Sequence, residues 1–301
     1  MAQEHIRAFT DIDGVSLSGI FSRTRTKAED LAQKFSIGKV CNSIEELFLA
    51  TQAQLVIIAV SEIEARRVCV EAFKYSWMCL IEKPVGYTLV EAKAIVKAAR
   101  ELGCKAYVAL NRRHYASTRA VIQDIARIDG QRLIHCYDQE NHADAVEAGR
   151  PLEVVQNMMF FNSIHVIDYL HVLGRGEVTS VNPIIHWQPD APRFVMAKIA
   201  YSSGDIGIYE AIWNGPGPWA VTVTTQQKRW ELRPLEHASV QLYGSREKEA
   251  LPTHPWDTQF KPGLRLQAEE AIKAVRQQST LLPTLDDALE TMKLVGAIYE
   301  I

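Results

Sequence analysis

A glutamate, a lysine and a proline stand together at Glu82, Lys83 and Pro84, directly after the apolar stretch Trp77–Ile81. If that stretch is a strand of a parallel sheet, the three residues lie at the edge where such sheets bind ligands. A lysine there could hydrogen-bond a substrate hydroxyl or exchange its proton, and the proline could hold a cis peptide bond that fixes the lysine's direction. The alternative is an ordinary exposed Glu–Lys pair.

A histidine, a carboxylate and an amide form a second group with catalytic potential. His165 and Asp168 are three residues apart, and Asn162 precedes His165 by three, so a helix would place them on one face. A histidine exchanges protons near neutral pH, and a neighbouring carboxylate can orient its ring. The spacing therefore predicts proton transfer by His165, oriented by Asp168; the alternative is a buried histidine that Asp168 merely satisfies.

Ser22, Arg23 and Thr24 follow another strand-like stretch, Val15–Phe21. In doubly wound folds the residue at this place meets the adenosine ribose, and an acidic residue favours NAD. A guanidinium beside two hydroxyls suits a 2′-phosphate instead, because arginine offers paired donors. The pattern favours NADP, and a solvated turn is the alternative.

A third basic group, Asn111, Arg112 and Arg113, follows the apolar stretch Lys105–Leu110. Two arginines at a strand end would suit a carboxylate, a phosphate or the diphosphate of a sugar nucleotide. They could equally form salt bridges to a second domain.

The elements that position these groups are expected to be repeated β-α units over residues 1–110. Strand-like runs alternate with helical patterns, and the capping-box pattern Ser/Thr-x-x-Glu starts at Thr26, Ser43, Ser61 and Thr88. The expected strands are Val15–Phe21, Lys39–Val40, Leu55–Val60, Trp77–Ile81 and Lys105–Leu110. Such alternation predicts a doubly wound α/β domain with a parallel sheet covered on both faces.

After residue 110 the pattern changes to an α+β domain. Residues 178–243 contain several strand-like runs separated by Pro, Gly, Asn and Asp, which predicts an open, mainly antiparallel sheet. Expected helices are Ala116–Ile128, Asn162–Leu173, Gln267–Gln278 and Thr284–Ile298. The tryptophans Trp213, Trp219, Trp230 and Trp256 are expected in the core or at an interface, and an aromatic platform for a substrate is the alternative. We expect a first domain over 1–110 and a second over 111–301, whose last helices pack back on the first.

Composition restricts the class of partner. The 301 residues carry a net charge of −3, which provides no basic field for nucleic acid. The longest strongly apolar run, Leu55 to Val60, is far shorter than the roughly 20 residues of a membrane helix, and no signal peptide opens the chain. The five cysteines are scattered without a CxxC pair, which indicates reduced thiols and no metal site. We therefore expect a cytoplasmic protein that acts on a small molecule and binds neither nucleic acid nor membranes.

The stretch IEKPVGYTLVEAKAIVKAARELGCKAYVALNRRHY resembles the Gfo/Idh/MocA family, which includes glucose–fructose oxidoreductase and inositol dehydrogenase. The resemblance implies an N-terminal Rossmann domain that binds NAD(P). It also implies a C-terminal domain whose open sheet forms the substrate site and the contacts of a homo-dimer or homo-tetramer. The implied reaction is hydride transfer at a carbinol of a sugar, cyclitol or sugar nucleotide; a non-catalytic relative that binds or regulates is the alternative.

The resemblance also implies roles for individual residues. Lys83 would lie between nicotinamide and substrate, and His165 would contact the substrate hydroxyl. The chain departs from the family's D-x-G-x-H-x-x-D segment, because Phe161 and Ser163 replace the first aspartate and the glycine. Asn162 cannot act as a base, so His165 is expected to carry more of the proton transfer, with Lys83 as helper. The expected catalytic residues are thus Lys83, His165 and Asp168. The expected cofactor contacts are Ser22, Arg23, Thr24, Val60, Ser61, Glu82, Lys83, Pro84 and Asn111, and the expected substrate contacts are Arg112, Arg113, Asn162 and His165.

The family's first strand and its G-x-G-x-x-A turn have no counterpart at the start of this sequence. The chain opens on the helical pattern MAQEHIRAF, and its nearest glycine, Gly14, follows that helix. The strand would be central in the sheet, and losing its buried side chains would forfeit about 7–15 kcal/mol. We expect an N-terminally truncated form of a longer product with poor cofactor affinity. An in-frame stop codon just before Met1, with no encoded G-x-G, would contradict this expectation.

Overall fold

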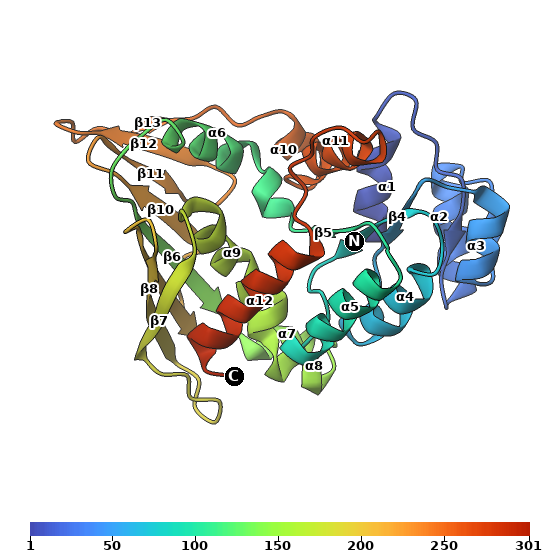
Figure 1. The fold of residues 1–301 in the computed structure, drawn as a ribbon, viewed down its shortest axis with the longest axis horizontal. Helices are drawn as coiled ribbons and strands as arrows, with labels where there is room; N and C mark the ends of the chain where they lie inside the picture. The colour runs from blue at the N-terminus through green and yellow to red at the C-terminus, as the bar shows by residue number, and fades with distance from the viewer.

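The computed structural model describes residues 1–301, and its first third consists of helices around short parallel strands (Figure 1). The elements are α1 (Ala2–Thr10), β1 (Ile20–Phe21), α2 (Arg25–Phe35), β2 (Val40–Cys41), α3 (Ile44–Thr51), β3 (Leu55–Ile58), η1 (Glu62–Glu64), α4 (Ala65–Ala72), β4 (Met78–Glu82), α5 (Leu89–Glu101) and β5 (Ala106–Ala109). Strands β3, β4 and β5 form a parallel sheet in that order, and β1 pairs with β2 in parallel. The predicted alternation of strands and helices is confirmed.

The parallel strands form two separate sheets rather than one. No ladder joins β1 to β3, and the expected strand Val15–Phe21 is reduced to Ile20–Phe21. A strand exists only where a partner accepts its hydrogen bonds, and residues 15–19 have no ladder partner. Val15 and Leu17 still pack against the buried residues of the first sheet layer, so the apolar pattern was informative about packing.

Two of the four predicted helix caps form. The side chains of Ser43 and Thr88 each accept a hydrogen bond from the backbone N–H three residues on. Thr26 already lies inside α2, which begins directly after the turn that ends β1. Ser61 opens a 3₁₀ turn without a side-chain cap, and the carboxylate of Glu64 binds Arg23 and Arg67 instead. The capping pattern therefore marked the start of α3 and of α5 and did not mark those of α2 and α4.

The second part of the chain contains one eight-stranded open sheet. Its strands follow the order β13-β12-β11-β10-β6-β9-β8-β7, and only β6 and β9 are parallel. The elements are η2 (Asn111–His114), α6 (Ala116–Ile125), β6 (Leu133–Glu140), α7 (His142–Glu147), α8 (Leu152–Gln156), the π-helical turn η3 (Met159–Ser163), α9 (Ile164–Leu173), β7 (Val178–Ile185), β8 (Phe194–Tyr201), β9 (Ile206–Trp213), β10 (Ala220–Thr224), β11 (Lys228–Leu232), β12 (Ala238–Leu242) and β13 (Glu249–Ala250). The predicted open, mainly antiparallel sheet is confirmed.

One face of the large sheet is covered and the other faces away from the chain (Figure 1). Along β9, Gly207, Tyr209, Ala211 and Trp213 are buried while the residues between them are half-buried. This period of two is that of a strand with one packed face. Helices α9 and α12 (Leu285–Tyr299) lie on the packed side.

The C-terminal helices connect the two parts. Helix α11 (Leu264–Val275), which follows the short α10 (Trp256–Gln259), packs against α1, and α12 packs against α5 and α9. Ile95 of α5, Leu170 of α9 and Met292 of α12 are fully buried members of one apolar cluster. The last helices thus hold the strand ends of the first part against the sheet of the second.

Candidate active site

Lys83 lies at the carboxyl end of β4, at the junction of the two parts. The Lys83–Pro84 peptide bond is cis, as the sequence suggested. The Nζ atom donates a hydrogen bond to the backbone oxygen of Phe161 at 2.7 Å and lies 5.8 Å from the centre of that ring. Burial lowers the pKa of Lys83 to about 8; the charge of Glu82 opposes this shift and that of Arg112 adds to it. The amine can therefore gain or lose a proton near neutral pH.

Glu82 is held by a histidine that sequence reasoning missed. His5 of α1 is buried, and its Nε2 atom lies 2.5 Å from Oε1 of Glu82. The contact joins residues 77 positions apart, so no local pattern could reveal it. Its only sequence signal is a histidine beside the apolar positions of a short helix.

His165 is 5% exposed and lies in α9 with its Nδ1 atom buried and without a hydrogen-bond partner. Burial lowers the pKa of His165 well below its ordinary value, and the charges of Arg112, Lys83 and Lys261 lower it further. The ring is therefore neutral at neutral pH. The sequence predicted that His165 transfers most of the proton, with Lys83 as helper. The two pKa shifts favour Lys83 as the proton-transferring group instead.

Asp168 shares helix α9 with His165 but contacts other residues. Its carboxylate accepts hydrogen bonds from Arg113 Nε at 2.7 Å, from Arg113 Nη2 at 2.6 Å and from Thr291 Oγ1 at 2.8 Å. The expected contact with His165 is thus replaced by a buried ion pair, because a buried guanidinium must find a counter-charge. The same pair settles the alternatives for Arg113, which forms a salt bridge within the chain.

Arg112 is the arginine left without a partner. No side-chain hydrogen bond or ion pair holds its guanidinium, and its Nε atom is buried without an acceptor. The Cζ atom lies 4.7 Å from the centre of the Trp219 ring, and Trp219 is 6.4 Å from the His165 ring between centroids. Trp219, which donates from Nε1 to the backbone oxygen of Gln139 at 2.9 Å, therefore belongs to the site rather than to a remote interface.

Asn111 and Asn162, two expected ligand contacts, use their amides within the protein. Asn111 donates from Nδ2 to the backbone oxygen of Pro262 at 3.0 Å and is buried. It thereby holds the loop of Lys261 near His165. Asn162 donates from Nδ2 to Glu140 at 2.8 Å. Burial raises the pKa of Glu140 well above its ordinary value, and the nearby Asp138 charge adds to this.

Ser22, Arg23 and Thr24 lie at the end of β1, with Val60 and Ser61 beyond β3. Ser22 Oγ accepts a hydrogen bond from the backbone N–H of Thr24 at 3.2 Å, and the Arg23 guanidinium donates to Glu64 at 2.9 Å. Because β1, β3 and β4 each run parallel to a neighbour, these groups follow strand carboxyl ends, where dinucleotides bind.

The residues fit a nicotinamide dinucleotide at both of its ends. Hydroxyls and a guanidinium follow β1 for the adenosine. At the other end, the orphaned buried atoms of Arg112 and His165 accompany Lys83. The sequence contains no G-x-G-x-x-G turn for the pyrophosphate.

The structure contains neither a cluster of potential metal ligands nor a helix that could span a membrane. No group of three or more His, Cys, Asp or Glu side chains could hold a metal ion. None of the helices combines the length and the apolar character that a membrane span requires.

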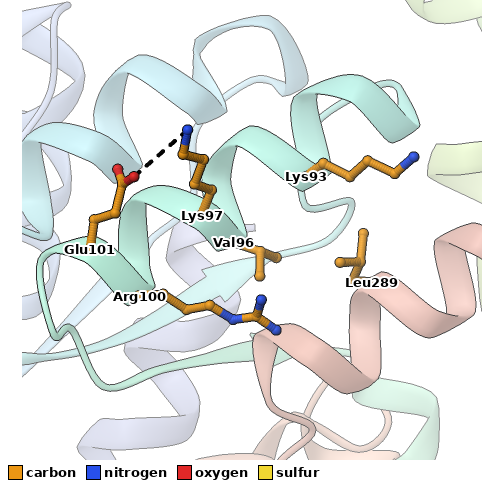
Figure 2. A pocket seen from close by; sticks show the side chains of 6 residues that line it. All are labelled: Lys93, Val96, Lys97, Arg100, Glu101 and Leu289. Atoms are coloured by element: carbon orange, nitrogen blue, oxygen red, sulfur yellow. Dashed lines mark ion pairs between the residues drawn. The ribbon is translucent and has the colours of Figure 1, made fainter.

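A surface hollow elsewhere does not belong to this site. Figure 2 shows it between α5 and α12, lined by Lys93, Val96, Lys97, Arg100, Glu101 and Leu289. Lys97 pairs with Glu101 across one turn of the helix, 3.7 Å from Nζ to Oε1. None of the expected catalytic, cofactor or substrate residues lines it.

Comparison with known proteins finds an oxidoreductase family similar to the first third of the chain. A family model described as an oxidoreductase family with an NAD-binding Rossmann fold matches residues 1–110. A 4-carboxy-2-hydroxymuconate-6-semialdehyde dehydrogenase from Sphingobium sp. strain SYK-6 is 21% identical over 226 residues, which cover 72% of this chain and 70% of the relative.

Solved structures share the fold over the whole chain. A dehydrogenase from Chromobacterium violaceum has a TM-score of 0.83 at 17% identity, covering 100% of this chain and 91% of its own. Levoglucosan dehydrogenase in complex with NADH and levoglucosan has a TM-score of 0.80 at 17% identity, with 100% and 94% covered. UDP-N-acetylglucosamine 3-dehydrogenase from Acidithiobacillus ferrooxidans has a TM-score of 0.79 at 16% identity, with 99% and 93% covered. The chain is thus similar to this oxidoreductase family over its first 110 residues, and it shares the fold of these solved structures over its whole length.

Proposed function

We propose that the protein is a NAD(P)-dependent oxidoreductase that transfers a hydride to or from a carbinol carbon of a sugar, cyclitol or sugar nucleotide. The observation that carries the proposal is Lys83, half-buried at the end of β4 beside His165, with its pKa lowered to about 8. The family-model match over residues 1–110 supports it, as does the shared fold with solved structures named as dehydrogenases of levoglucosan and of UDP-N-acetylglucosamine.

In the direction of alcohol oxidation, the protein's own groups manage the proton. When bound, the nicotinamide supplies the hydride acceptor at its C4 atom. The carbinol carbon would lose hydride to that acceptor, and the free amine of Lys83 would take up the hydroxyl proton as the carbonyl forms. The Phe161 backbone oxygen fixes the position of Nζ, and the neutral His165 ring hydrogen-bonds the reacting oxygen. Asp168 acts through Arg113, as a positioning residue.

The cofactor preference is part of the proposal. Arg23, Ser22 and Thr24 favour the 2′-phosphate of NADP over the hydroxyl of NAD. The division at residue 110 into a cofactor domain and a substrate domain, the homo-oligomer and the cytoplasmic location remain predictions.

Nicotinamide fluorescence provides the test. Titration with NADPH and with NADH is expected to give saturable binding of both and tighter binding of NADPH. Absence of binding to either would contradict the oxidoreductase and favour a relative that binds or regulates without catalysis. Tighter binding of NADH would contradict the roles of Ser22 and Arg23.

A screen of sugars, cyclitols and sugar nucleotides then tests the chemistry. Lys83→Ala is expected to lower kcat by about 10²–10⁴-fold on any substrate found. Lys93→Ala removes an exposed lysine of α5 and is the matched control. Full turnover by Lys83→Ala would remove the assigned role of Lys83.

A further inference from the structure

The guanidinium of Arg112 differs from its neighbours in having no counter-charge. Arg113 is bound by Asp168, and Arg150, which lies 5.1 Å from the Phe161 ring, is bound by Glu62. Arg112 has neither an ion pair nor an acceptor, and its Nε atom is shielded from solvent. Because the protein encloses Nε, the donors left for a ligand are the two terminal Nη groups, which no acceptor of the protein occupies.

The Trp219 ring determines how that ligand can approach. It covers one face of the guanidinium at 4.7 Å, which is the geometry of a cation–π contact. Because the ring stacks on the flat face of the guanidinium, the N–H donors of Arg112 remain available along the edge of that group. A planar anion that accepts two parallel hydrogen bonds matches this edge.

The charges around the reacting groups point to the same ligand chemistry. Arg112, Lys83 and Lys261 all act on His165, and no carboxylate offsets them there. The nearest acidic side chains are already bound, Glu82 by His5 and Glu62 by Arg150. The charges that act on His165 are therefore all positive, whereas those of Glu82 and Glu62 offset part of the positive charge at Lys83.

We propose that Arg112 binds a carboxylate of the substrate, so that the substrate is a hydroxy acid of the sugar or cyclitol type, such as a uronic acid. Arg112 pairs with the carboxylate through two hydrogen bonds while Lys83 and His165 hold the carbinol to be oxidised. A carboxylate fits better than a phosphate, because a single free arginine cannot satisfy the oxygens of a dianion while Lys83 serves the hydroxyl. The inference rests on the proposed function and narrows its substrate class.

Matched substrate pairs test the inference by turnover. We expect higher kcat/KM with galacturonate than with galactose, and with quinate than with myo-inositol. Arg112→Met is expected to lower kcat/KM for the acids by about 10–100-fold and to leave the neutral partners within a few-fold. Arg112→Lys keeps the charge but loses the fork and is expected to fall between. Arg246→Met, in an exposed loop far along the large sheet, is the control of equal charge change.

Binding without turnover separates this inference from the proposed function. Calorimetric titration of the protein with galacturonate is expected to show saturable binding that Arg112→Met abolishes and Arg246→Met retains. If galacturonate binds in this way but neither NADPH nor NADH binds, the result supports the carboxylate site and contradicts the proposed oxidoreductase activity. Preference for neutral sugars or sugar phosphates, or equal losses on acids and neutral partners in Arg112→Met, would overturn the carboxylate site while leaving the oxidoreductase intact.

Discussion

At the scale of single residues, the site consists of basic groups with few partners inside the protein. Lys83 has a backbone oxygen and no carboxylate within hydrogen-bond reach, and His165 has an unpartnered ring nitrogen. Asp168, by contrast, uses both oxygens on Arg113 and Thr291. In the proposed site the ligand would therefore meet Lys83, His165 and Arg112, whereas Asp168 and Arg113 are bound to each other.

The first prediction concerns the pH dependence of oxidation. Lys83 accepts a proton only as the free amine, and its pKa is lowered to about 8. The rate of alcohol oxidation is therefore expected to rise with pH through an apparent pKa near 8, and the rate of the reverse reduction to fall over the same range. Steady-state rates of the wild type and of Lys83→Arg check this. A wild-type profile that is flat between pH 7 and 9 would contradict the assignment.

The second prediction concerns the buried ion pair. Asp168→Asn leaves the buried guanidinium of Arg113 without its counter-charge and is expected to cost about 3–5 kcal/mol of unfolding free energy. Arg113→Met combined with Asp168→Asn is expected to cost less than the sum of the single changes. Urea denaturation of the four proteins measures the coupling, and additive losses would show that the pair contributes nothing as a pair.

The same pair determines a limit at low pH. Burial alone would raise the pKa of Asp168, but Arg113 and Thr291 hold it below its usual value. A carboxyl with a lowered folded-state pKa contributes stability above its unfolded pKa of about 3.9, and this stability is lost as the pH falls through the folded value.

At the scale of elements, three segments distant in sequence meet at the end of β4. The π-helical turn η3 presents the Phe161 backbone oxygen to Lys83. Trp219, just before β10, supports Arg112 of η2. The loop of Lys261 is joined to Asn111 and brings its charge to bear on His165.

The third prediction tests that loop. Gly263 has a φ of +77°, and a Cβ atom there would lie 2.2 Å from the backbone oxygen of Asn111. Gly263→Ala is therefore expected to cost about 2–4 kcal/mol and to raise KM, because the loop must move away from the site. Gly244 has a φ of +83°, and a Cβ atom added there would have no neighbour within 4 Å. Gly244→Ala is the control and is expected to cost about 1–2 kcal/mol without a change in KM. Equal effects of the two changes would contradict the close approach.

At the scale of the whole molecule, α11 and α12 hold the two parts together and the large sheet leaves one face uncovered (Figure 1). The uncovered face includes Phe194, which is 56% exposed, and Ile212, its partner across β8 and β9. Ile206 and Ile208 are half-buried on the same face. Lys198 and Glu210 lie on this face among them, and exposed apolar residues rimmed by charged ones are typical of a protein interface.

The fourth prediction follows from that face. We expect a homo-oligomer through the sheet, whose two-fold symmetry would use the same strands from each copy. Ile208→Glu is expected to shift the protein to monomers by placing a charge in the interface, as measured by size-exclusion chromatography with light scattering. Val90→Glu, which alters an exposed apolar residue of α5, is the control. A wild-type monomer, or an oligomer unaffected by Ile208→Glu, would contradict this interface.

Local sequence patterns determined the elements and their order. The alternation of apolar runs and helical patterns predicted the parallel strands, and Pro84 after β4 predicted the turn with its cis bond. Strand and helix periods depend on neighbours within a few residues, so a single sequence reveals them. The open sheet after residue 110 was predicted for the same reason.

Tertiary structure alone decided which polar groups are partners. Helical spacing predicted that Asp168 orients the His165 ring. In the structure α9 packs against η2 and α12, and the Asp168 carboxylate instead accepts hydrogen bonds from Arg113 and Thr291. The contacts of His5 with Glu82 and of Trp219 with Arg112 join segments about 80 to 110 residues apart in the sequence, so no local pattern indicates them. A buried charge takes whichever counter-charge the packed core brings within reach. That choice depends on the arrangement of whole elements, and it is what leaves Lys83, His165 and Arg112 available for a ligand.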